Sequence, residues 1–282
     1  MLYVIVIIAV VVTIGILLYA LSMPNNKVVV FDLDGTLGDF GNVSTIWFSL
    51  QNYHKGKLPN SAFFELMDLF PEFLRPNIFA IMNYLKLKKT DRRLKKVFIY
   101  TNNQGPKSWA VLIKDYFNYK LKYNLFDQVV GAFKVAGKII EPCRTSNAKR
   151  YDDFIKCTML SKRTEICFVD DQYHEDMMND HVYYIYIEPY LLDIPIDQLV
   201  RRYMLRETTF DRSPLHALTS NKSPLDKAYV TEEDKLISKR LMGYLQRFLR
   251  VSHGTLRHRP SRKSLRTRTQ RRKITDDSTL NL

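Results

Sequence analysis

Short apolar runs alternate with amphipathic stretches through the middle of this chain. Four runs rich in Val, Ile, Phe and Tyr are typical of buried strands, at 27–31, 96–100, 165–169 and 182–187. Apolar positions at helical spacing predict helices over 76–89, 107–121 and 147–160. Strands that alternate with helices indicate an α/β sandwich with a mostly parallel sheet. In such sheets ligands bind at the carboxyl ends of the strands.

The first 22 residues follow a different pattern, because none of them carries a charged side chain. A helix of about 20 apolar residues spans the roughly 30 Å hydrocarbon core of a bilayer. We therefore expect a transmembrane helix over 1–22, since the apolar core of a signal peptide is only about 7–15 residues long. Lys27 and the net basic remainder follow this segment. The positive-inside tendency then predicts a single-pass membrane protein whose main domain faces the cytosol.

The C-terminal part begins with a stretch rich in Ser, Thr and Pro, which is typical of a linker. Thr231 and Asp234 then give a helix start signal, followed by apolar residues at helical spacing. This amphipathic helix either packs on the globular domain or lies on an anionic membrane surface. We divide the chain into an anchor, a globular domain, a linker, an amphipathic helix and a flexible basic tail: 1–22, 24–205, 206–230, 231–250 and 251–282.

The net charge is concentrated near the C-terminus. The chain has 282 residues and a formal charge of +14, and its hydrophobic content of 46% excludes a disordered polyelectrolyte. Residues 250–273 hold ten Lys or Arg and no acid. A nucleic acid or an anionic lipid is the partner that such a tail would bind, and the sequence does not choose between them.

The three cysteines, Cys143, Cys157 and Cys167, show no C-x-x-C spacing and cannot all pair. Neither a disulfide framework nor a cysteine zinc site is therefore expected. This composition indicates a reducing compartment.

Polar residues capable of chemistry follow three of the predicted strands. Asp32, Asp34, Gly35 and Thr36 come after the first strand, Thr101 and Asn102 after the second, and Asp170 and Asp171 after the third. Because these strand ends share one edge of a parallel sheet, we expect the side chains to lie close together.

Clustered carboxylates repel one another unless a cation lies between them. Mg²⁺ prefers oxygen ligands, so it is the expected cofactor, held by Asp32, Asp34, Asp170 and Asp171. A metal-bound carboxylate can attack phosphorus, and a second carboxylate two residues on can serve as acid and base. Gly35 permits a tight turn, and the hydroxyls of Thr36 and Thr101 can hold phosphate oxygens.

These motifs resemble those of the haloacid dehalogenase superfamily of phosphohydrolases. FDLDGTL at 31–37 is similar to its first motif, which implies Asp32 as nucleophile and Asp34 as acid and base. IYTNN at 99–103 is similar to the second motif, which implies that Thr101 contacts the phosphoryl group. ICFVDD at 166–171 is similar to the fourth, which implies that Asp170 and Asp171 bind Mg²⁺.

The resemblance further implies a lysine that steadies the nucleophile. Lys149 fits this third motif best and Lys156 fits it less well. The candidate catalytic residues are thus Asp32, Asp34, Thr101 and Lys149. The candidate substrate-binding residues are Gly35, Thr36 and Asn102.

The insertion between the first and second motifs is short, so we expect a small cap or none. An open site suits a bulky phosphomonoester on a macromolecule, with a phosphoprotein as the first choice. The Arg75-Pro76 pair and the Asp-Asp motif resemble those of small C-terminal-domain phosphatases. The run 99–105 equally resembles polynucleotide 3′-phosphatases, and the overall style resembles proteins of large DNA viruses. The alternatives are a nucleic-acid 3′-phosphatase and a catalytically weak, membrane-anchored binding protein.

Overall fold

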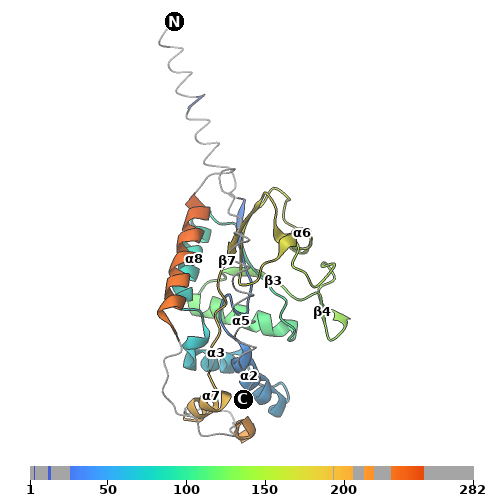
Figure 1. Cartoon of the computed structure of the whole chain (residues 1–282), viewed down its shortest axis with the longest axis vertical. Coiled ribbons are helices and arrows are strands. Elements are labelled where there is room, and N and C mark those ends of the chain that lie inside the picture. Colours follow the sequence, from blue (N-terminus) through green and yellow to red (C-terminus); the bar gives the residue numbers. More distant parts are fainter. Residues whose placement is uncertain are drawn as a thin grey trace, which may run out of the picture.

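A computed structural model describes residues 3, 12–13, 26–192, 194–205, 213–218 and 230–250 of the chain (Figure 1). At its centre is a five-stranded sheet in the order β3-β2-β1-β6-β7. All neighbouring strands in this sheet are parallel. The strands are β1 (Lys27–Phe31), β2 (Lys96–Tyr100), β3 (Phe126–Val130), β6 (Glu165–Asp170) and β7 (Val182–Tyr186). The α/β class with a mostly parallel sheet is thus confirmed.

Alternate residues of each strand face opposite sides of the sheet and supply two hydrophobic cores. Val29 and Phe31 of β1 belong to one core, whereas Val28 and Val30 belong to the other. The second core is covered by the short helix α6 (Tyr151–Thr158). The first and larger core is covered by α2 (Gly41–Tyr53), α3 (Asn60–Leu69), α4 (Ile78–Thr90), α5 (Lys107–Leu121), α7 (Ile196–Met204) and α8 (Glu232–Arg250). Helices therefore flank both faces of the sheet in three layers.

The insertion between β1 and α4 consists of α2, α3 and the 3-10 turn η1 (Pro71–Phe73). Its helices pack into the larger core through aromatic contacts. The ring centroids of Trp47 and Phe63 lie 5.3 Å apart, and those of Phe63 and Trp109 in α5 lie 5.2 Å apart. The insertion is thus part of the main body at this side of the sheet.

Three short elements complete the described structure. A two-stranded hairpin of β4 (Lys134–Val135) and β5 (Lys138–Ile139) follows β3, and the 3-10 turn η2 (Glu175–Met177) follows β6. The turn η3 (Ser213–Leu218) falls inside the predicted linker, most of which lies outside the described residues. The basic tail at 251–282 lies outside them as well.

No helix in the described ranges combines the length and the apolar composition needed to cross a membrane. This finding corrects the expectation of a transmembrane helix at 1–22 and of a single-pass membrane protein. The longest described helix, α8, has 19 residues and starts with three acids. A spanning helix needs about 20 mostly apolar residues instead. Within 1–25 the structure describes Tyr3, Val12 and Thr13 alone.

The structure differs from the expectation that the cysteines form no disulfide framework, because two of the three are paired. Cys143 and Cys157 form a disulfide, with their Cα atoms 5.1 Å apart, and Cys167 is buried and free. The pairing depends on the path of the loop between β5 and α6, which brings Cys143 next to Cys157. The spacing of the cysteines in the sequence does not predict this path.

The amphipathic helix α8 packs on the domain, which is the first of the two arrangements considered for it. The Thr231 Oγ1 accepts a hydrogen bond from the Asp234 N–H at 3.1 Å and thereby starts the helix. Its apolar face joins the larger core, and the ring of Phe248 stacks on Tyr183 of β7 at a centroid distance of 5.8 Å. At its end, Lys27 Nζ donates to the Phe248 carbonyl at 2.7 Å.

This packing predicts unequal effects of two leucine substitutions on the same helix. Leu245 has no exposed surface, whereas Leu236 is 44% exposed. Because a buried truncation loses apolar contacts and leaves a cavity, Leu245→Ala should lower the free energy of unfolding by about 3 kcal/mol. Leu236→Ala should lower it by less than about 0.5 kcal/mol. Urea unfolding of both variants measures the difference, and equal effects would show that α8 is not docked.

Candidate functional site

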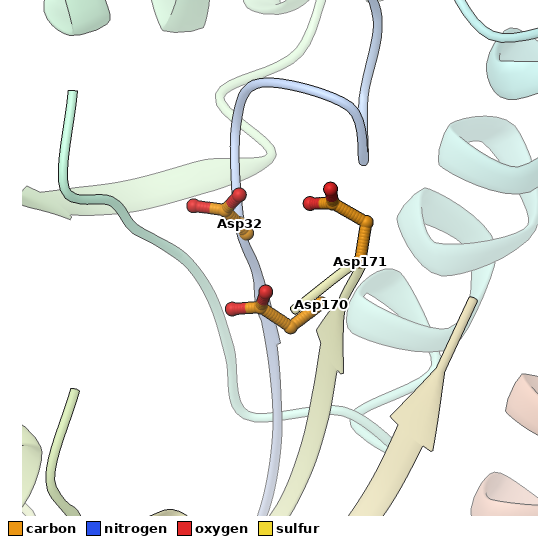
Figure 2. Close-up of side chains that lie close together, drawn as sticks. All are labelled: Asp32, Asp170 and Asp171. Atoms are coloured by element: carbon orange, nitrogen blue, oxygen red, sulfur yellow. The ribbon is translucent and has the colours of Figure 1, made fainter. Parts of the chain in front are cut away.

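Three acidic side chains meet where β1 and β6 end (Figure 2). Asp32 follows β1 directly, and its backbone N–H donates to the Val169 carbonyl at 2.9 Å, so the neighbouring strands hold it in register. Asp170 is the last residue of β6, and Asp171 follows it. One side-chain oxygen from each of these three residues lies within 4.8 Å of the others. The sheet therefore brings Asp32 together with the Asp170–Asp171 pair, which is far from it in the sequence.

Lys149 connects two of these carboxylates. Its Nζ donates to Asp32 Oδ1 at 2.5 Å and to Asp170 Oδ2 at 2.7 Å. The residue lies in the loop before α6, not inside a helix as the predicted range 147–160 implied, because α6 starts only at Tyr151. Burial opposes the charge on Lys149, but the carboxylates of Asp170 and Asp32 outweigh it and raise its pKa. The ammonium is therefore held charged between the two acids.

One ammonium does not neutralise the three acids. Burial raises the pKa of Asp32 to about 8, in spite of the nearby Lys149. Burial and the charge of Asp170 also raise the pKa of Asp171. For Asp170 burial acts in the same direction, but the contacts with Lys149 and His174 prevail and lower its pKa. The three acids are thus disfavoured as carboxylates side by side, and a bound cation would favour their ionised forms.

Asp32, Asp170 and Asp171 could hold a metal ion, because all three offer carboxylate oxygens at one place. Hard divalent cations take such ligands, and the cluster's charge fits them. Asp34, which the sequence analysis placed among the ligands, is not part of this group.

Asp34 is held apart from the cluster by an amide. Asn103 Nδ2 donates to Asp34 Oδ2 at 2.7 Å, and Asn103 is itself fixed because its Oδ1 accepts from the Gly105 N–H at 2.8 Å. The Asn103 N–H in turn donates to Thr101 Oγ1 at 3.0 Å. Burial raises the pKa of Asp34 and so favours its protonated form. The sequence analysis gave no role to Asn103 and named Asn102, whose Oδ1 accepts from Arg144 at 2.8 Å.

Gly35 and Thr36 form the turn that faces Asp171. Thr36 Oγ1 accepts from the Asp171 N–H at 3.1 Å and lies 3.2 Å from Asp171 Oδ1. Gly35 has a φ of +73°, and a Cβ placed there would lie only 2.7 Å from Asp171 Oδ2. A side chain at this position would therefore both strain the turn and displace an acid of the cluster.

Arg75 fixes the same turn from behind, a role that sequence reasoning missed. It is 1% exposed, and its Nε donates to the Thr36 carbonyl at 2.7 Å. Its Nη2 donates to the carbonyls of Gly35 and Glu188, at 2.5 and 2.7 Å. These acceptors belong to the backbone of distant segments, so no residue spacing reveals them. In the sequence, Arg75 stood out only as part of the Arg75-Pro76 pair, which indicated a resemblance and no contact.

Comparison with protein-family models, with curated proteins and with solved structures yields no match for this chain. The arrangement of the described elements is compatible with a Rossmann-like fold, because a parallel five-stranded sheet lies between helices. What the site can do chemically must therefore be argued from its own atoms.

Proposed function

We propose that this chain is a Mg²⁺-dependent phosphohydrolase of the haloacid dehalogenase type, which works through an aspartyl-phosphate intermediate. One observation carries the proposal: Lys149 bridges Asp32 and Asp170 beside Asp171, while Asp34 is held separately by Asn103. Two carboxylates two residues apart thus have different environments, which suits different chemical roles.

In the proposed reaction, an Asp32 oxygen attacks the phosphorus atom of a phosphate monoester. The bond between phosphorus and the ester oxygen breaks, and Asp34 gives its proton to that oxygen. Asp34 then takes a proton from a water molecule, which attacks the phosphorus of the aspartyl phosphate. Inorganic phosphate leaves and the Asp32 carboxylate is restored.

The other residues of the site support these two steps. Lys149 keeps Asp32 oriented and adds positive charge near the transferred group. Thr101 places its hydroxyl at the end of β2, beside the Asn103 N–H that it binds. When bound by Asp32, Asp170 and Asp171, Mg²⁺ would supply further neutralisation of charge on the phosphoryl oxygens.

The packing of the insertion supports a bulky substrate, and we propose a phosphoprotein. Phe48 of α2 and Phe63 of α3 both contact Trp109 of α5, and the two helices belong to the larger core. Because their apolar residues stabilise the domain in this position, they are not free to close over a small molecule as a separate lid.

Hydrolysis by the purified full-length chain tests the proposal. With Mg²⁺ it should release phosphate from p-nitrophenyl phosphate and from phosphoserine peptides. Removal of the metal with EDTA should lower the rate to the buffer background, because the site then lacks the cation that neutralises charge on the phosphoryl oxygens. Addition of Mg²⁺ should restore it. An inactive protein in the presence of Mg²⁺, or one indifferent to EDTA, would contradict the proposal. If phosphate is released faster from 3′-phosphorylated oligonucleotides than from peptides, the proposed substrate would become a nucleic-acid 3′-phosphate in place of a phosphoprotein.

A further inference from the structure

Arg144 lies under the candidate site, in the loop between β5 and α6. It is 2% exposed and is among the largest fully buried side chains of the described structure. Its guanidinium carbon lies 4.8 Å from the ring centroid of Tyr100, the last residue of β2. No motif or periodicity marks this arginine in the sequence, and the reaction proposed above gives it no part.

The guanidinium joins the ends of two strands to the loop that carries Lys149. On the strand side, Nη1 donates to the carbonyls of Thr101 and Gly131, at 3.2 and 2.6 Å. On the loop side, Nη2 donates to the carbonyls of Asn147 and Ala148, at 3.2 and 3.1 Å. Those two residues immediately precede Lys149. One planar group thus ties the backbone at Thr101 to the backbone beside Lys149.

A third contact of Nη2 sets the start of the loop after β2. It donates to Asn102 Oδ1 at 2.8 Å. The next residue, Asn103, binds both the Thr101 hydroxyl and the Asp34 carboxylate. The fork geometry of a guanidinium fixes distance and angle together, which a single ammonium does not do.

This arrangement is costly for an arginine that serves the fold alone. Its hydrogen bonds all go to neutral oxygens, and its buried Nε has no hydrogen-bond partner. Burial lowers the pKa of Arg144, which reflects the penalty on its charge. Apolar residues commonly stabilise a buried position as well as a charged group does. A role of this charged group in the site would account for the penalty of burying it.

We propose that Arg144 is a positioning residue that fixes Thr101 and Lys149 relative to each other for phosphoryl transfer. This inference rests on the proposed phosphohydrolase function. Arg144 contacts neither Asp32 nor Asp34, so it acts through the residues that do.

Three variants test the proposal: Arg144→Met, Arg144→Lys and the exposed control Arg163→Met. At a temperature at which circular dichroism shows all of them folded, Arg144→Met should lower kcat/KM about 10²-fold, the scale of a misplacement near 1 Å. Arg144→Lys should recover part of this loss, because an ammonium can reach some of the carbonyls. Arg163→Met should retain wild-type turnover. Unchanged turnover in Arg144→Met would overturn the proposal.

A double-mutant cycle separates positioning from a general structural role. If Arg144 acts through Thr101, then Arg144→Met should lower kcat/KM much less in a Thr101→Ala background than in the wild type. If the loss of kcat/KM in the double variant equals the product of the two single losses, the effects are independent and the proposal is overturned. If Arg144→Met does not fold, the same cycle with Arg144→Lys decides.

Hydrogen exchange distinguishes failure of this inference from failure of the proposed function. In Arg144→Met, amides at 101–103 and 147–149 should exchange faster than in the wild type, while those of β7 should not change. If the wild type shows no turnover, the phosphohydrolase proposal fails and this exchange pattern still reports on positioning. Unchanged exchange in both segments would overturn the role of Arg144 itself.

Discussion

Asp32→Asn is expected to reduce phosphate-ester hydrolysis to the buffer background. The asparagine keeps the size of the side chain and can still accept from Lys149, so the local structure should persist. Its amide oxygen, however, is a poor nucleophile towards phosphorus and cannot form the aspartyl phosphate. The variant should therefore fold like the wild type and lose both turnover and covalent labelling. Steady-state rates with p-nitrophenyl phosphate measure the loss of turnover. Acid quenching after incubation with a radioactively labelled phosphate ester measures the loss of covalent labelling.

A matched control for this variant is Asp152→Asn. Asp152 is an exposed acid in the first turn of α6, so the same chemical change occurs outside the site. Its rate should equal that of the wild type within about twofold, because surface substitutions of this kind have small effects. Unaltered turnover in Asp32→Asn would rule out Asp32 as the nucleophile.

Asp34→Asn should lower kcat by roughly 10² to 10⁴-fold, the usual contribution of a general acid and base. The size of the loss should depend on the leaving group. An alkyl phosphate such as phosphoserine needs protonation of its ester oxygen, whereas p-nitrophenolate leaves without it. The loss should thus be larger for the phosphoserine peptide. The second step still lacks its base with either substrate, so labelled aspartyl phosphate should accumulate on Asp32.

The Asn103 contact gives this prediction its structural basis. Asn103 holds the Asp34 carboxylate at 2.7 Å, and burial raises the pKa of that carboxyl group. Burial suits a group that enters the reaction protonated, while the Asn103 hydrogen bond opposes this shift in pKa and holds the carboxyl group in place. Equal losses for the two leaving groups, with no accumulated intermediate, would argue that Asp34 has a different role.

The strands were predictable because their signal is local. The ranges 27–31 and 96–100 agree with β1 and β2, since each apolar run is buried on both faces of the sheet. The strand β3, FDQVV, has exposed and partly exposed positions, and the predicted ranges did not include it. The helix over 147–160 was too long, because the loop that presents Lys149 occupies its first residues.

The candidate site was only partly accessible to sequence reasoning. Asp32, Asp170 and Asp171 follow strands, and parallel strands end at one edge, so their meeting could be inferred. Arg75 and Arg144 bind backbone carbonyls, and any residue type supplies such a carbonyl. The disulfide between Cys143 and Cys157 similarly depends on the path of a loop.

The sequence by itself determined the α/β class, the main strands and the acids at their ends. The apolar runs and the polar residues that follow them are local patterns of a few residues each. The resemblance of the motifs implied that Lys149 lies beside Asp32, but only the tertiary structure decided that Lys149 also contacts Asp170 and that Asn103 binds Asp34. Lys149 lies between Asp32 and Asp170, and Asn103 lies on Asp34, because loops from different strands converge at one edge. Such convergence is set by the packing of the whole sheet and its helices, and no local pattern records it.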